Sequence, residues 1–322
     1  MKESKFEQMN FLGAKRTPFL FFINFNKDNI LIYLPSELVK NDIEIDFPSF
    51  KTPSMPLLEK KPIVFEKKPI SFENYLLKYH KVNAAIKSGN TYLLNLTQKT
   101  PISCNLSLNE IYQSANSLFK VRYAKEWLFF SPEKFITIEK NKLTTYPMKG
   151  TIDASMPNAE ALILGNKKET SEHNTIIDLL RNDISIVGKQ TKVEKYRFVS
   201  EINTNEGKLL QVSSAISAIL SSNWKNKIGT ILDKLTPAGS ITGAPKPKTT
   251  ELIKQIENYE RGFYTGISGY FDGNKLETCV NIRFIENTEG GMVFKSGGGI
   301  HLLSDPKEEY EEMIKKVYLP FL

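Results

Sequence analysis

The order of the predicted elements favours an α+β fold over a doubly wound parallel sheet. Apolar strand-like runs come in groups, and amphipathic helices separate these groups instead of alternating with single strands. Towards the C-terminus, three strand-like runs are joined by turns that contain Gly273-Asn274 and Gly290-Gly291, as in antiparallel hairpins.

The composition bounds the class of protein. The chain has 322 residues, 40% hydrophobic and 25% charged, which is typical of a globular protein with one large or two ordinary domains. The net charge of +7 is dispersed and no nucleic-acid-binding motif accompanies it, so we expect a small acidic substrate and no nucleic acid. The apolar run 19–23 is too short to cross a membrane. We expect a cytoplasmic protein in which Cys104 and Cys279 are free thiols.

Hydrophobic spacing predicts the elements of the first half. Residues 1–69 form a reduced N-terminal region, with strands in 19–25 and 30–34 and a connection rich in Pro and Lys at 47–69. Residues 70–322 form the second domain. It begins with helices at 72–88 and 108–118, and with strands at 92–96, 127–138 and 143–147.

The second half continues with longer helices. Helices are predicted at 159–186, 228–235, 245–257 and from Asp305-Pro306 to about Tyr318. The last two helices have Pro in the first turn. Strands are predicted at 196–202, 209–216, 262–271, 276–285 and 292–296.

Lys149 is the first candidate for chemistry. It follows Tyr146-Pro147-Met148 and precedes Gly150 and Thr151, so it lies between an apolar strand and a turn. An amine in this position can serve as a nucleophile. By itself the pattern is more typical of a solvated lysine at a strand end.

Acidic residues on two predicted helices form the second candidate. Glu309, Glu312 and Lys316 follow i, i+3, i+7 spacing and project from one helix face. Glu172 lies on the helix that also carries Asp178 and Asp183. Carboxylates from two helices would suit Mg²⁺, although a charged run is more often a solvated face.

Two segments of small residues and one arginine could hold an anion. Residues 236–246, which include Thr242 and Gly243, lead into a helix N-terminus where backbone N–H groups favour negative charge. Gly298 is the centre of a glycine triplet after a strand, where the backbone can approach a ligand. Arg283 alternates with apolar residues and is either a carboxylate ligand or an exposed strand residue.

Taken together, the motifs resemble those of the chorismate-utilising enzymes from about Asn90 to the C-terminus. The matching segments, in family order, are 131–135, 147–151, 178–183, 239–246, 297–300 and the acidic C-terminal helix. The resemblance implies a large two-lobed antiparallel β-sandwich core flanked by helices. The Pro-x-Lys-Gly-Thr form resembles aminodeoxychorismate synthase component I, whereas anthranilate synthase component I has a small residue in place of Lys149. Isochorismate and salicylate synthases have a water-activating lysine where this chain has Leu93.

The resemblance also implies roles for the candidate residues. Glu172 and Glu312 would hold Mg²⁺ against the ring carboxylate of chorismate, with Glu309 supporting them. The remaining substrate contacts would come from Gly150, Thr151, Thr242, Gly243, Arg283, Gly298 and Lys316, of which Arg283 and Gly298 would hold the pyruvyl carboxylate.

Two residues would carry the chemistry that the resemblance implies. Glu133 would protonate the leaving C4 hydroxyl, for which burial must raise its pKa, and Lys149 would attack C2 as a neutral amine. Ammonia would then add at C4 to give 4-amino-4-deoxychorismate. Because no glutaminase segment is recognised in the chain, ammonia is expected from a separate glutamine amidotransferase component or from solution.

One departure from the family pattern leaves alternatives open. Gln211 stands where the family has a histidine, and glutamine forms hydrogen bonds but carries no charge. A non-catalytic subunit that binds an amidotransferase is therefore one alternative. Anthranilate synthase component I is the other, and Lys149 argues against it.

Overall fold

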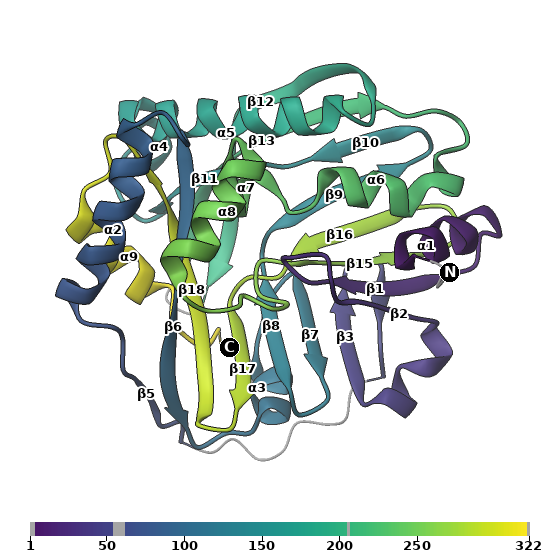
Figure 1. The fold of residues 1–322 in the computed structure, drawn as a ribbon, viewed down its shortest axis with the longest axis horizontal. Helices are drawn as coiled ribbons and strands as arrows, with labels where there is room; N and C mark the ends of the chain where they lie inside the picture. Colours follow the sequence, from purple (N-terminus) through teal and green to yellow (C-terminus); the bar gives the residue numbers. More distant parts are fainter. Residues whose placement is uncertain (1–3, 54–61, 205–206, 321–322) are drawn as a thin grey trace.

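A computed structural model describes residues 4–53, 62–204 and 207–320, and within these residues the chain forms two nine-stranded antiparallel sheets. In Figure 1 the strands of the first sheet run mostly across the upper half, and those of the second run up and down below it. Helices cover the upper and left sides. The arrangement confirms the predicted α+β class.

The first sheet has the strand order β11-β13-β10-β9-β16-β15-β1-β2, and β12 pairs with β13 beside this path. Its strands are β1 (Phe19–Ile23), β2 (Ile30–Tyr33), β9 (Lys134–Glu139), β10 (Lys142–Thr145), β11 (Met148–Asp153), β12 (Lys189–Thr204), β13 (Gly207–Ile219), β15 (Ile267–Phe271) and β16 (Leu276–Val280).

The second sheet has the order β14-β6-β18-β17-β8-β7-β3-β4, with β5 paired to β6. Its strands are β3 (Ile43–Phe47), β4 (Phe50–Lys51), β5 (Phe65–Lys67), β6 (Leu93–Cys104), β7 (Phe119–Tyr123), β8 (Trp127–Ser131), β14 (Gly243–Ala244), β17 (Phe284–Thr288) and β18 (Gly291–His301). The N-terminal strands β1 and β3 pair with β15 and β7, so residues 19–47 contribute to both sheets.

The helices largely follow the predicted spacing. They are α1 (Lys5–Ala14), α2 (Phe72–Lys87), α3 (Leu108–Ser114), α4 (Ala159–Gly165), α5 (Lys167–Ser185), α6 (Ile228–Leu235), α7 (Gly239–Thr242), α8 (Lys246–Glu257) and α9 (Pro306–Lys315), with short 3₁₀ turns η1 (Pro35–Glu37), η2 (Val39–Asn41) and η3 (Trp224–Lys227). Helix α1 was not predicted. Ser4 and Glu7 form its capping box, and Asn10 bonds to Thr230 on α6.

Two predicted strands are each divided between the sheets. The run 127–138 is β8 of the second sheet followed by β9 of the first, and the run 276–285 is β16 of the first followed by β17 of the second. The chain therefore crosses from one sheet to the other after Ser131 and again after Val280. Polar residues interrupt both runs at the crossovers, Pro132 and Glu133 in the first and Asn281 and Arg283 in the second, but the prediction did not treat them as strand ends.

Two further predictions can be compared with the structure. Cys104 is half-buried, Cys279 is buried, and both are free, as expected; burial raises the pKa of each thiol. Among the described residues, no helix is both long enough and apolar enough to cross a membrane.

Candidate active site

The two crossovers run next to each other where the sheets meet, and each carries a predicted site residue. The N–H of Val280 donates to the carbonyl of Glu133 (3.1 Å), and the N–H of Phe130 donates to the carbonyl of Arg283 (3.3 Å). Arg283 has a φ of 54°, a left-handed conformation that costs energy in a non-glycine residue. Its guanidinium donates to the Tyr318 hydroxyl (3.4 Å). The junction thus places Glu133 and Arg283 on neighbouring segments.

The carboxylate of Glu133 is tied to the segment of small residues. Its Oε1 accepts a hydrogen bond from Ser240 Oγ (2.9 Å) at the start of α7. An ion pair between Lys246 and Asp183 (2.8 Å) fixes the end of this segment to α5. Burial lowers the pKa of Lys246 and raises that of Asp183, while each partner opposes the shift of the other. The pair holds Ser240 within reach of Glu133.

Thr242 and Gly243 lie deeper in the same segment. Thr242 is fully buried, and its Oγ1 has no hydrogen-bond partner in the described part of the chain. Gly243 has a φ of 120°, and a Cβ added there would lie 1.8 Å from the carbonyl oxygen of Leu93. Only glycine fits this approach of β14 to β6. Leu93 itself is a buried aliphatic side chain of β6.

Three charged side chains of α9 converge on Gly298. A Cβ added at Gly298 would lie 3.3 Å from Glu309 Oε2, 3.8 Å from Lys316 Nζ and 4.0 Å from Glu312 Oε1. Lys316 Nζ contacts Glu312 Oε1 (2.7 Å) and donates to the carbonyl of Gly297 (2.9 Å). Glu309 is buried and accepts from Ser304 Oγ (2.8 Å). The predicted face of α9 therefore lies against the glycine triplet, with the Glu312 side chain still 53% exposed.

Local sequence explains why α9 lies there. Asp305 caps the helix by accepting from the N–H groups of Lys307 and Glu308. Ser296 Oγ donates to the carbonyl of Met313 (3.0 Å), which ties the helix to β18.

Glu172 lies against the end of the same strand. Its Oε1 is 2.9 Å from His301 Nε2, and His301 Nδ1 accepts from the N–H of Leu303 (3.1 Å). Because Nδ1 is the acceptor, Nε2 carries the hydrogen and donates it to the Glu172 carboxylate. His301 is three residues beyond Gly298 on β18. It was not predicted, although its position after the glycine triplet was a signal.

Lys149 and Gly150 form a bulge in β11. Met148 pairs with Ser213 and Thr151 with Gln211, so two residues of β11 oppose one residue of β13. Gly150 has a φ of 84°, and a Cβ added there would lie 3.2 Å from Glu169 Oε2. The side chains of Lys149 and Thr151 lie outside the described part of the structure. Gln211 is half-buried next to the bulge.

Helix α5 contacts both the bulge in β11 and the end of β18. Glu169 and Glu172 lie one turn apart on α5, and they reach Gly150 and His301 respectively. Glu169 was not predicted, but its i, i+3 spacing from Glu172 was a visible signal. Ser240 was missed as well, because nothing in the sequence shows which hydroxyl meets Glu133.

The acidic residues can be tested for their fit to Mg²⁺. In the described ranges, no group of three or more His, Cys, Asp or Glu side chains is arranged to hold a metal ion. Mg²⁺ does not need such a group, because it commonly uses one or two carboxylates together with water and substrate oxygens. Glu309 Oε2 and Glu312 Oε1 both lie within 4.0 Å of the position of a Cβ added at Gly298 and supply oxygen donors of this kind. Glu172, the other predicted ligand, has its Oε1 on His301 at the end of the same strand.

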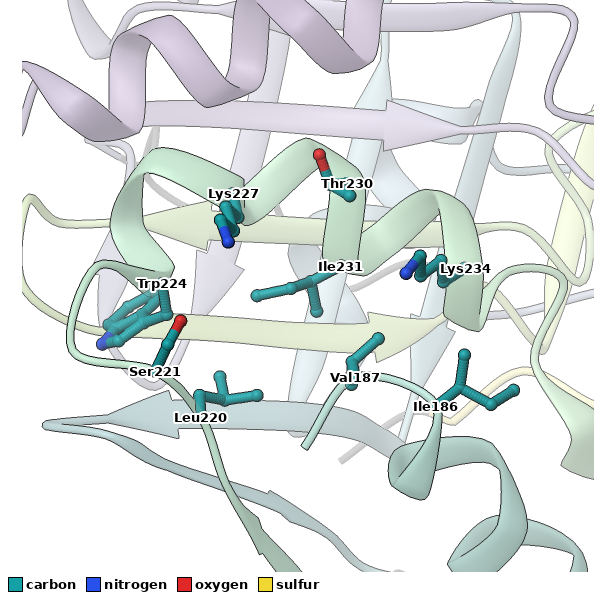
Figure 2. A pocket seen from close by; sticks show the side chains of 9 residues that line it. All are labelled: Ile186, Val187, Leu220, Ser221, Trp224, Lys227, Thr230, Ile231 and Lys234. Carbon is teal, nitrogen blue, oxygen red and sulfur yellow. The ribbon is translucent and has the colours of Figure 1, made fainter. Parts of the chain in front are cut away.

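A recess of ≈ 260 Å³ elsewhere contains none of these residues. Figure 2 shows its apolar floor, formed by Val187, Leu220 and Ile231, with Lys227 and Lys234 on the adjoining η3–α6 segment. Its lining carries no carboxylate. None of the predicted site residues lines this recess.

The comparisons with known proteins identify the family. The family model for the chorismate-binding enzymes matches residues 26–320, so the chain belongs to this family. An uncharacterised PabA-like protein of Haemophilus influenzae is 46% identical over 98% of this chain and 95% of its own length.

Relatives with a named activity match only part of their own length. Aminodeoxychorismate synthase component 1 of Bacillus subtilis is 31% identical over 74% of this chain, which spans 53% of that protein. Anthranilate synthase component 1 of Acetivibrio thermocellus is 30% identical over 73% of this chain and 50% of its own. Overall identity therefore does not separate the two activities.

A solved structure supports the fold. MenF, the menaquinone-specific isochorismate synthase of Escherichia coli, superposes with a TM-score of 0.72 at 16% identity, covering 97% of this chain and 79% of that one.

Proposed function

We propose that the protein converts chorismate and ammonia to 4-amino-4-deoxychorismate, as an aminodeoxychorismate synthase component I acting in the cytoplasm towards p-aminobenzoate and folate. The observation that carries this proposal is Lys149 in the Pro-x-Lys-Gly-Thr segment, where the anthranilate enzymes have a small residue. Membership of the chorismate-binding family supports the substrate. Leu93, which cannot act as a base, argues against water as the nucleophile.

The charged groups divide into two sets around the substrate. Glu172 and Glu312 would hold Mg²⁺, which when bound neutralises and orients the ring carboxylate, and Glu309 would support them. Arg283 would pair with the pyruvyl carboxylate near Gly298, and Lys316 would add positive charge. Gly150, Thr151, Thr242 and Gly243 would line the remaining surface.

The chemical steps use Lys149 and Glu133. The Lys149 amine forms a bond to C2, the ring double bonds shift, and the C4 hydroxyl leaves with a proton from Glu133. Ammonia then bonds to C4, the double bonds shift back, and the bond to Lys149 breaks. The balance is chorismate plus ammonia giving aminodeoxychorismate plus water. A glutamine amidotransferase component would supply the ammonia.

A product assay tests the proposal. Purified protein is incubated with chorismate, Mg²⁺ and ammonium salt, and the products are separated by chromatography. We expect 4-amino-4-deoxychorismate, and no product after the metal is chelated. Anthranilate as the main product would overturn the proposal in favour of anthranilate synthase. Chorismate left unconsumed, with intact binding to an amidotransferase, would favour the non-catalytic alternative.

A further inference from the structure

A second group of polar residues surrounds an open recess of ≈ 380 Å³ next to β6. It lies among the segment before α2, α2 itself, β6 and the C-terminal end of α8; α2 and β6 are neighbours on the left of Figure 1. Lys68, Lys78, Gln98, Lys99 and Tyr259 are part of its lining. None of these residues was predicted to take part in the chorismate site.

The recess lies where β6 lacks a neighbouring strand. On the outer edge of β6, β14 pairs with residues 93–94 and β5 with residues 102–104. Between them, side chains and loops cover the edge: the Glu257 carboxylate accepts from the N–H of Thr97, and the N–H of Lys68 donates to the carbonyl of Pro101. Gln98 and Lys99 lie in this interval.

Gln98 carries the main observation. It is only 4% exposed, and its Oε1 accepts from Lys78 Nζ (3.0 Å). Because an ammonium group only donates, this contact fixes which amide atom is the oxygen. The remaining atom, Nε2, is buried and has no hydrogen-bond partner among the described residues. A buried N–H donor without a protein acceptor is uncommon, and a water or a ligand can supply the acceptor.

The charges around Gln98 favour an anionic acceptor. Lys68, Lys78 and Lys99 form no ion pair with any other described residue. Glu257 also lines the recess and opposes the lowering of the Lys78 pKa, while both of its oxygens accept hydrogen bonds from Arg261 (2.9 and 2.7 Å). Burial lowers the pKa of Lys78, which an added anion would oppose. Three lysines and Gln98 thus line the same recess.

We propose that this recess binds a small metabolite through an oxyanion, either a carboxylate or a phosphate. Gln98 Nε2 donates to the oxyanion, and Lys78, Lys68 and Lys99 surround it with positive charge. The recess has the size of a small-ligand site. The proposal does not depend on the reaction assigned to the chorismate site.

Gln98→Glu gives the sharpest test. The new carboxylate still accepts from Lys78, so the local fold is preserved, but an oxygen replaces the Nε2 donor and repels an anion. Asn90→Asp makes the same change of charge at an exposed position beyond the end of α2 and serves as the control. Inorganic phosphate and benzoate are the probes, titrated by calorimetry at constant ionic strength.

Wild-type protein is expected to bind at least one probe saturably. Binding should weaken about tenfold or more in Gln98→Glu, as for the loss of a hydrogen bond to a charged group, and stay unchanged in Asn90→Asp. Phosphate binding alone identifies a phosphorylated ligand, and benzoate binding alone a carboxylate.

Three results would overturn the proposal. They are no binding of either probe to wild-type protein, unchanged binding in Gln98→Glu, and equal weakening in both variants. A second variant, Lys68→Ala with Lys99→Ala, removes two exposed side chains that do not support the core. It should weaken binding while the melting temperature without ligand stays the same, and unaltered affinity would count against the site.

Discussion

The strand β8 takes part in two regions that differ in kind. At its start, Trp127 stacks on Tyr123, Phe263 and Phe284, with ring centroids 4.9–5.5 Å apart. Just beyond its end, Glu133 lies in a crossover beside Arg283, which has a positive φ. The aromatic region is regular and apolar, whereas the crossover region contains a half-buried carboxylate and a residue with a positive φ. Regular packing provides stability, and the irregular positions are those with predicted chemistry.

The largest effect is expected at the crossover. Glu133→Gln removes the proposed proton donor to the leaving hydroxyl, so the rate of chorismate consumption should fall by about 10²- to 10⁴-fold. The free energy of unfolding should change little, because Glu133 is half-buried and its Ser240 contact can remain. Steady-state kinetics with urea denaturation measures both quantities. Glu126→Gln, in the exposed turn before β8, is the control; equal losses in the two variants would contradict the role of Glu133.

In the aromatic region we expect a loss of stability without a loss of catalysis. Trp127→Ala should lower the free energy of unfolding by about 3–5 kcal/mol, because a large buried side chain leaves a cavity. The folded fraction should keep its KM for chorismate. Urea titration measures the loss, with Phe11→Ala, at a site 52% exposed, as control. If Trp127→Ala kept the wild-type free energy of unfolding but consumed chorismate more slowly, the distinction between the two regions would be contradicted.

Ser240→Ala tests a smaller contribution to the crossover region. Losing the hydroxyl that positions Glu133 should reduce kcat about tenfold and leave KM unchanged. The pH above which kcat declines should rise, because the lost donor favours the charged carboxylate and Glu133 acts as an acid. Ser185→Ala, on the exposed end of α5, should have neither effect. A kcat and pH profile like wild type would remove Ser240 from the site.

The smallest effect is expected at the edge of the aromatic region, where Arg122 binds Asp42 through two hydrogen bonds (2.6 and 3.0 Å) and holds its pKa below the usual range. A lowered folded pKa means that the pair stabilises the fold above the usual Asp value and loses this as pH falls through the folded value. Asp42→Asn should therefore cost less than about 1 kcal/mol at pH 7.

That cost should shrink steadily below about pH 3.9, the usual pKa of an Asp. Urea titrations of wild type and variant across this range measure it. A cost that grows as the pH falls would contradict the assigned sign.

From the sequence, the helices and the residue types of the site could be predicted better than the geometry of the site. Capping residues and spacing located α2, α8 and α9, and the spacing placed Glu309, Glu312 and Lys316 on one face of α9. That this face meets the glycine triplet was not predicted. The crossovers were missed because apolar residues resume within a few positions, although polar residues such as Pro132 and Glu133 interrupt the run. Contacts between distant segments, such as Ser240 with Glu133 or Glu172 with His301, depend on the assembled fold.

The most direct test of the account is the mass of the protein after incubation with chorismate and Mg²⁺ in the absence of ammonia. We predict that the peptide containing Lys149 gains the mass of one chorismate less one water, and that ammonium removes this adduct while aminodeoxychorismate forms. Lys149→Ala should show neither the adduct nor the product. Formation of aminodeoxychorismate by the Lys149→Ala variant at the wild-type rate would contradict the central claim.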